Sequence, residues 1–205
     1  MRFFRDLSPG AKVAASFAVV GVASAVAGLG TFATFTSSTA ASNTVSTGTV
    51  VIALGATGAS TNRLNINATL VAAGDTIQRS VDLLDTGTID LASVSLDTTA
   101  SPSTLLDTDA VDGLQMVIDA CDVPWTESGP PYTYTCSGTT SSVLASAPVI
   151  GASLALSNLT ALTAGATDHL RVTLTLPGTA GNTFQNLSST ITYTFTGTQR
   201  AATDR

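Results

Sequence analysis

The runs LRVTLTLPG (residues 170–178) and ITYTFT (residues 191–196) carry the clearest structural signal in the chain. In the first run, leucine and valine alternate with arginine and threonine. In the second, isoleucine, tyrosine and phenylalanine alternate with threonine. Successive side chains of a β-strand point to opposite faces. The period of two therefore predicts two strands, each with an apolar face toward a core and a threonine-rich face away from it.

Shorter runs of the same kind fill the chain after residue 48, and turn signals separate them at intervals of roughly 8–12 residues. Many short strands in this arrangement are typical of an antiparallel β-sandwich, so we expect an all-β, jelly-roll-like domain over residues 49–205. Leu114 to Ile118 also fits the start of a short helix, although a strand is favoured. The expected strands are Thr49 to Leu54, Arg63 to Leu70, Ile77 to Leu83, Ile89 to Leu96, Leu114 to Ile118 and Leu154 to Leu159, with turns at Gly74-Asp75 and Thr86-Gly87-Thr88.

The N-terminal region has the layout of an export signal. Basic residues precede an uncharged, apolar stretch, Val13 to Leu29, so we expect residues 1–33 to be a signal peptide and the mature protein to be secreted, to the cell surface or an extracellular matrix. If the signal is retained, Val13 to Phe35 is about long enough to span a bilayer, which needs roughly 20 residues, and would be the only membrane attachment. Small residues suited to cleavage occur at Ala23-Ser24-Ala25, Ala25-Val26-Ala27 and Thr31-Phe32-Ala33.

Composition and charge exclude several classes of function. Only 11% of the residues are charged and 44% are hydrophobic, which argues against disorder. Residues 1–33 carry a net charge of +2, so their removal takes the net charge from −6 to −8. An acidic surface repels phosphate backbones, so we expect no nucleic-acid binding. Lys12 is the only lysine, so the mature protein cannot be a pilin that is cross-linked through lysine isopeptide bonds.

The only two cysteines are Cys121 and Cys136. In an exported chain they predict a disulfide, which would close a loop of about 15 residues and stabilise the fold by about 3 kcal/mol in the chain-entropy model. The loop contains the only tryptophan, Trp125, and the only glutamate, Glu127. It either binds a partner through its aromatic side chains or is a surface loop whose tryptophan packs on the sheet. The second interpretation is favoured.

Motifs for catalysis are absent from the sequence. His169 is the only histidine, and no HExxH or Gly-x-Ser-x-Gly pattern occurs. A Ser-His-Asp triad would have to use His169, which lies on the polar face of its expected strand. We therefore predict no catalytic residue, and favour an exposed or structural histidine.

The acidic cluster Asp107, Asp109 and Asp112 precedes Gly113. Closely spaced carboxylates suit Ca²⁺, which takes 6–8 oxygen ligands. The spacing departs from the EF-hand loop, and no glutamate follows to close it. Calcium is therefore a weak candidate against a solvated acidic turn, and we predict no other metal or cofactor.

Several segments together carry a family resemblance: GTFATFTS (residues 30–37), NTVSTGTVVI (43–52), GDTIQRSVDL (74–83) with TGT (86–88), and FQNLSSTITYTFT (184–196). In order and spacing they resemble the TasA/camelysin family of secreted proteins. The resemblance implies cleavage by a dedicated signal peptidase after Ala33, which leaves Thr34 as the mature N-terminus. Residues 98–148 do not match clearly, so the cysteine pair is not part of the resemblance.

The resemblance implies two functions of different classes. TasA-like members are jelly-roll subunits of biofilm-matrix filaments, in which the N-terminal segment of one subunit inserts as a strand into the sheet of the next. Camelysin-like members are described as casein-cleaving metallo-endopeptidases, but a catalytic zinc takes three protein ligands plus water, and no motif here supplies them.

We therefore expect a structural filament subunit and not an enzyme, with residues 34–48 as the donor segment. The alternatives are a monomer whose segment pairs with its own sheet and a surface adhesin that uses the loop around Trp125. Whether filaments form from this protein alone or need an accessory protein stays open. The candidate donor residues are Thr34, Phe35, Val45, Val50, Val51 and Ile52.

Overall fold

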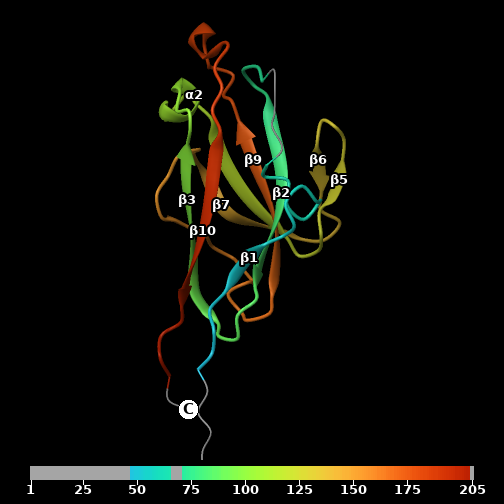
Figure 1. Cartoon of the computed structure of the whole chain (residues 1–205). Coiled ribbons are helices and arrows are strands. Elements are labelled where there is room, and N and C mark those ends of the chain that lie inside the picture. Colours follow the sequence, from blue (N-terminus) through green and yellow to red (C-terminus); the bar gives the residue numbers. More distant parts are fainter. Residues whose placement is uncertain (1–46, 66–70, 204–205) are drawn as a thin grey trace, which may run out of the picture. The chain divides into compact units, whose positions relative to one another are not determined.

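Two antiparallel β-sheets that pack face to face form the body of the protein (Figure 1). The structure is a computed structural model that describes residues 47–65 and 71–203. These residues belong to one unit, Ser46–Arg205. The predicted signal peptide, its cleavage site at Ala33 and Thr34, and the candidate donor residues Phe35 and Val45 lie outside the described residues.

The larger sheet has five strands in the order β1-β2-β9-β4-β7. The LRVTLT run lies in β9, at the centre of this sheet, where it pairs with β2 on one side and with β4 on the other. The strands are β1 (Ile52–Leu54), β2 (Thr76–Asp85), β9 (Thr167–Thr175), β4 (Gln115–Cys121) and β7 (Thr140–Pro148).

The smaller sheet has three strands in the order β10-β3-β8. The ITYTFT run lies in β10, which pairs with β3 over its whole length, with an irregularity between Thr198 and Gln199. The strands are β10 (Ile191–Gln199), β3 (Leu91–Ala100) and β8 (Leu154–Ala155).

Three short elements complete the described fold. The hairpin of β5 (Thr126–Ser128) and β6 (Thr133–Thr135) forms a two-stranded sheet beside β2 (Figure 1). The single-turn helix α2 (Leu105–Thr108) lies between β3 and β4, and the 3₁₀ turn η1 (Asn182–Phe184) lies between β9 and β10.

The core lies between the two sheets. Leu83 on β2, Ile118 on β4 and Leu170 on β9 meet Leu96 on β3, and all four side chains are completely buried. The core-facing residues of β9 are the alternate ones of the LRVTLT run, as the period of two predicts. The all-β sandwich predicted from the sequence is confirmed.

Two predicted strands are wrong in extent. Thr49 to Leu54 was expected to be a buried strand, but β1 has three residues at the sheet edge, and Val51 is 46% exposed. Residues 49–51 pass beyond the end of β2 and bond instead to the turn that follows it, where Thr86 N–H donates to the Val51 carbonyl (2.8 Å). Leu154 to Leu159 contributes only the two residues of β8.

The third expected strand, Arg63 to Leu70, is not a strand where the structure describes it. After an isolated bridge between Asn62 and Val81, Arg63 N–H donates to the Ser80 carbonyl on β2 (2.8 Å) and Leu64 and Asn65 form a turn. Residues 66–70 lie outside the described residues. The Asn62 side chain donates to the Gly55 carbonyl (3.0 Å), so the local polar groups fold this segment back on itself.

Strand β7 and the hairpin β5–β6 were missed. In β7 only Val143 is buried, and the rest of the strand is mostly serine, alanine and threonine. Such a strand has little hydrophobic periodicity of its own and is specified by pairing with β4.

Candidate functional site

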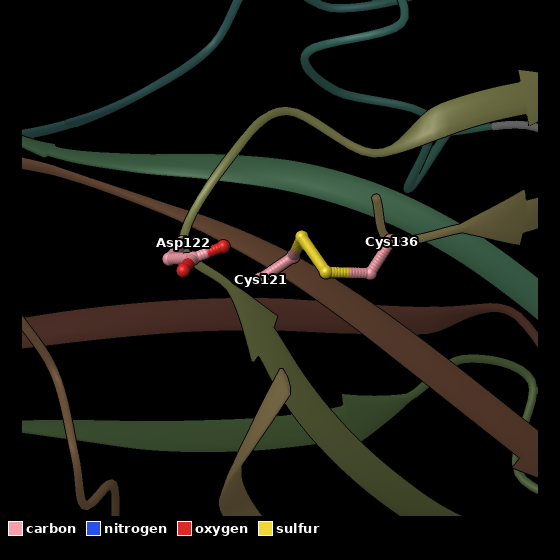
Figure 2. Close-up of side chains that lie close together, drawn as sticks. All are labelled: Cys121, Asp122 and Cys136. Carbon is pink, nitrogen blue, oxygen red and sulfur yellow. A yellow bond between two sulfur atoms is a disulfide. The ribbon is translucent and has the colours of Figure 1, made fainter. Parts of the chain in front are cut away.

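A disulfide between Cys121, at the end of β4, and Cys136, after β6, closes the loop that carries the hairpin (Figure 2). Their Cα atoms lie 5.8 Å apart. Asp122 lies beside the bond, and this trio is the one group of potential metal ligands among the described residues whose atoms come within 4.8 Å of one another. The two sulfurs are bonded to each other and Asp122 accepts from Thr139 N–H (2.8 Å), so the trio offers no thiolate for a metal.

Trp125 packs toward the sheet. Its indole N–H donates to the His169 carbonyl on β9 (2.8 Å), and the guanidinium of Arg171 lies 4.4 Å from the centroid of its ring. A cation over an aromatic face is attracted by the ring quadrupole. The structure thus has the favoured arrangement, in which the tryptophan anchors the loop.

Glu127 ties the hairpin to the segment that follows β1. Both of its carboxylate oxygens accept from Arg63, at 2.8 Å from Nε and 2.6 Å from Nη2, and the Tyr134 hydroxyl donates to it at 2.9 Å. The hydrogen bonds from Arg63 hold the pKa of Glu127 below its ordinary value. The guanidinium carbons of Arg63 and Arg79 lie 5.3 Å and 5.4 Å from the centroid of the Tyr132 ring, so two cations contact this ring. The Glu127 side chain therefore holds the hairpin to the segment after β1 through a charged pair.

His169 belongs to a set of cross-strand polar pairs on the same sheet face. Its Nδ1 lies 2.8 Å from Asp82 on β2, and the neighbouring Arg171 donates to Asp119 on β4 (2.7 Å). No serine among the described residues hydrogen-bonds to the imidazole. The Asp–His half of a triad is present, and within residues 47–65 and 71–203 no serine or threonine hydroxyl hydrogen-bonds to it.

The three aspartates of the acidic cluster bind different partners. Asp107, 5% exposed, accepts from Thr104 N–H (2.7 Å) and from the hydroxyls of Ser103 and Ser189 (each 2.5 Å). Burial alone would raise the pKa of Asp107, but these hydrogen bonds hold it below the usual value. Asp107 thereby completes the capping box of α2.

Asp109 and Asp112 have separate roles. Asp109 accepts from the backbone N–H groups of Val111 and Asp112 (each 2.9 Å), and these bonds lower its pKa. Asp112 accepts from the Thr179 hydroxyl (2.6 Å). Among the described residues, the candidate calcium ligands do not form a group whose oxygens lie within 4.8 Å of one another.

Strand β10 has one backbone side that pairs with no described strand. Its partners Thr98 and Val94 on β3 direct backbone groups to Gly151 and Leu156 on the far side. In an antiparallel ladder, the two residues of a non-hydrogen-bonded pair both point their N–H and C=O groups away from the partner strand. The N–H and C=O groups opposite them therefore point away from β3, and we call these groups the β10 edge: Ile191, Tyr193, Phe195 and Gly197.

The side chains of Ile191, Tyr193 and Phe195 face the core. Tyr193 and Phe195 pack against the main cluster, and burial raises the pKa of Tyr193 to about 12. The other outer strands are less open: β1 and β8 have three and two residues, and along β7 the Ser157 N–H donates to the Val143 carbonyl (3.1 Å). Among the described residues β10 is thus the longest regular edge.

The described candidate donor residues belong to the domain itself. Ile52 pairs with Asp85 in β1, and Val50 and Ile52 pack against the core. The chain is tied to its own domain from Thr49 onward, where Thr88 N–H donates to the Thr49 carbonyl (2.8 Å).

No helix in residues 47–65 and 71–203 is both long and apolar enough to cross a membrane. A search of curated proteins found no match to the chain.

Comparison with known families gave one match. The family described as camelysin metallo-endopeptidase matches residues 9–119, more than half of the 205 residues. The matched region runs from the predicted signal peptide to β4 and ends just before Cys121, so the stapled hairpin lies beyond it. This extent agrees with the residues that carry the sequence resemblance at its N-terminal side, and the chain belongs to the TasA/camelysin family.

Proposed function

We propose that this protein is a secreted structural subunit that assembles non-covalently into extracellular filaments, in which each copy donates its N-terminal segment as a strand to the next. The observation that carries the proposal is the β10 edge. The nine-residue strand β10 has apolar side chains toward the core, and its outer backbone groups pair with no described strand. Unpaired backbone groups of this kind template an added strand.

The donor segment fits this edge in length and chemistry. Residues 34–46 carry no charge. Thirteen extended residues span about 43 Å, whereas the nine residues of β10 span about 30 Å. The segment is therefore long enough to cover the whole edge.

Strand direction favours a donor from another copy. Gly48 lies against Ile89, and Arg200 N–H donates to the Asp90 carbonyl (3.2 Å), so the described chain begins near the Gly197 end of β10. A segment that covers its own β10 and then reaches Gly48 must run parallel to β10. A copy stacked on the Ile191 end brings its segment in antiparallel, and antiparallel pairs outnumber parallel ones and are slightly more stable per residue.

A catalytic role receives no support from the arrangement of side chains, although the family's description includes peptidase activity. A catalytic zinc needs three protein ligands. The only histidine and the only glutamate in the chain are bonded to Asp82 and Arg63. We therefore propose a structural role.

Negative-stain electron microscopy of Thr34–Arg205 beside Thr49–Arg205 tests the proposal. We expect filaments from the longer chain only, because the shorter chain keeps every described strand and lacks the donor. Two globular, monodisperse preparations would contradict spontaneous polymerisation through this segment, and the adhesin or accessory-protein alternatives would then be favoured. Casein cleavage by the same pure protein that stops with a chelator would contradict the structural role.

A further inference from the structure

An open cleft of about 540 Å³ lies at the Ile191 end of β10. Ala100, which pairs with Ile191, forms part of its wall together with Thr99 on β3, and the α2 region and the end of β7 with Ile150 form the rest. The Thr104 and Ser189 hydroxyls, 2.7 Å apart, hold α2 to the chain just before β10. The lining residues are Thr99, Ala100, Ser103, Asp107, Thr108, Ala110, Pro148 and Ile150.

The exposed large apolar side chains of the described residues gather at two separate places. Val111, 75% exposed, follows Ala110 of the cleft wall, and Leu105 on α2 is 37% exposed. Val51 and Leu54, 46% and 37% exposed, lie at β1. The β1 residue Ile52 lies against Gly197, so these two apolar pairs are at opposite ends of β10 (Figure 1).

Resting on the proposed strand donation, we infer that the cleft at the α2 end of one copy holds the Val51 region of the next copy. A donor that runs antiparallel along the β10 edge reaches the Ile191 end at its last residues, near Ser46. Residues 47–51 of the donor copy then extend at most about 18 Å beyond that end. They start next to Ile191, with β10 between them and Ala100, at a distance of about two strand spacings or 10 Å. Val51 is therefore within reach of the cleft.

The contact uses two different surfaces on each copy. Val51 of one copy meets the Val111 side of another, and its own Val111 is left for a third. Such a heterologous contact does not close on itself unless the rotation makes a ring, so it propagates as a filament. The cleft thereby sets the direction of growth, and the β10 edge supplies the backbone pairing.

Cysteine cross-linking tests the contact, because both native cysteines are already joined. In Thr34–Arg205, the double variant Val51→Cys with Val111→Cys should form a ladder of covalent multimers under mild oxidation. A mixture of the two single variants should stop at dimers. The pair Val51→Cys with Ser128→Cys, whose second site lies on the hairpin, is the matched control and should give no ladder.

The outcomes separate the two proposals. Filaments without a ladder would overturn the cleft contact and leave strand donation standing, whereas neither filaments nor ladder would overturn both. A ladder from Thr49–Arg205 as well would support the cleft and overturn the need for the donor. Val111→Asp should also raise the concentration needed for filament growth by about tenfold, the loss expected when one valine-sized apolar contact is removed.

Discussion

Glu127 and Arg63 are 64 residues apart in the chain, yet their two hydrogen bonds join the stapled hairpin to the segment after β1. Both side chains are about one-fifth exposed or less. The Tyr134 hydroxyl also donates to Glu127, so both carboxylate oxygens accept hydrogen bonds that hold the hairpin. At the residue scale, the chain's only glutamate is thus explained by architecture.

We expect Glu127→Gln to lower the Tm at pH 7 and to weaken the acid dependence of stability. Because Arg63 lowers the pKa of Glu127 from its ordinary 4.5, the carboxylate contributes stability above pH 4.5 that is lost as pH falls through the folded-state pKa. Thermal unfolding of both proteins across this range measures the effect. Asp107 contributes in the same direction in both proteins, so the profile should flatten only in part. Parallel profiles would show that the pair does not couple to folding.

The hairpin β5–β6 is held at one end by the disulfide and along its length by Trp125 and Glu127. Each contact reaches a different part of the fold: β4, β9 and the segment after β1. At the element scale, the 121–136 loop is therefore fixed to the five-stranded sheet and links strands β4 and β9 with the segment after β1.

Removal of the disulfide by Cys121→Ala with Cys136→Ala should lower the free energy of unfolding by about 3 kcal/mol, the chain-entropy value for a loop of about 15 residues. Trp125 is the only tryptophan, so its fluorescence reports directly whether the hairpin stays on the sheet. We expect the emission to shift to the red at denaturant concentrations below those that unfold the sheets followed by circular dichroism. Coincident transitions in the variant would mean that the hairpin and the sheets remain one cooperative unit. Reduction of the wild-type bond is the matched control.

Among the described residues, one side of the smaller sheet is an edge without a partner strand, and exposed apolar side chains lie at both ends of that edge. A subunit that stays monomeric has to cover such an edge itself, because uncovered edges promote association. The arrangement therefore favours a molecule whose surface is completed by a neighbour.

A synthetic peptide of residues 34–46 should bind Thr49–Arg205 and, added to Thr34–Arg205, should shorten its filaments in proportion to its concentration. The physical reason is that the peptide occupies the β10 edge and carries no domain to continue growth. Isothermal titration with the shortened chain and filament length by electron microscopy check this. A scrambled peptide of the same composition is the control, and equal shortening by both peptides would rule out a specific donor.

The sequence by itself determined the class of the fold and two of its strands, the central strand β9 and the outer strand β10. Alternation in residues 170–176 and 191–196 is a local property, since each side chain's face follows from its place along the strand. The expectation that the chain is exported likewise predicts the pairing of Cys121 with Cys136 without knowledge of the fold. Strand β7 escaped prediction because its burial comes from β4 and not from its own hydrophobic pattern.

Only the tertiary structure decided what the single histidine and the single glutamate do, and which side of β10 pairs with no described strand. Nothing near Arg63 or Glu127 in the chain indicates their pairing. The aspartates at 107–112 fit a calcium loop or a capping box equally well in the sequence, and only the contact of the distant Ser189 with Asp107 distinguishes the two. Val50 and Ile52 read as donor residues because they are apolar, but they pack on their own core. The side of β10 opposite β3 lacks a partner among the described strands because β10 is the outermost strand of its sheet. These properties depend on contacts between residues far apart in the chain, and a local sequence pattern carries no information about which distant residue or strand will be the partner.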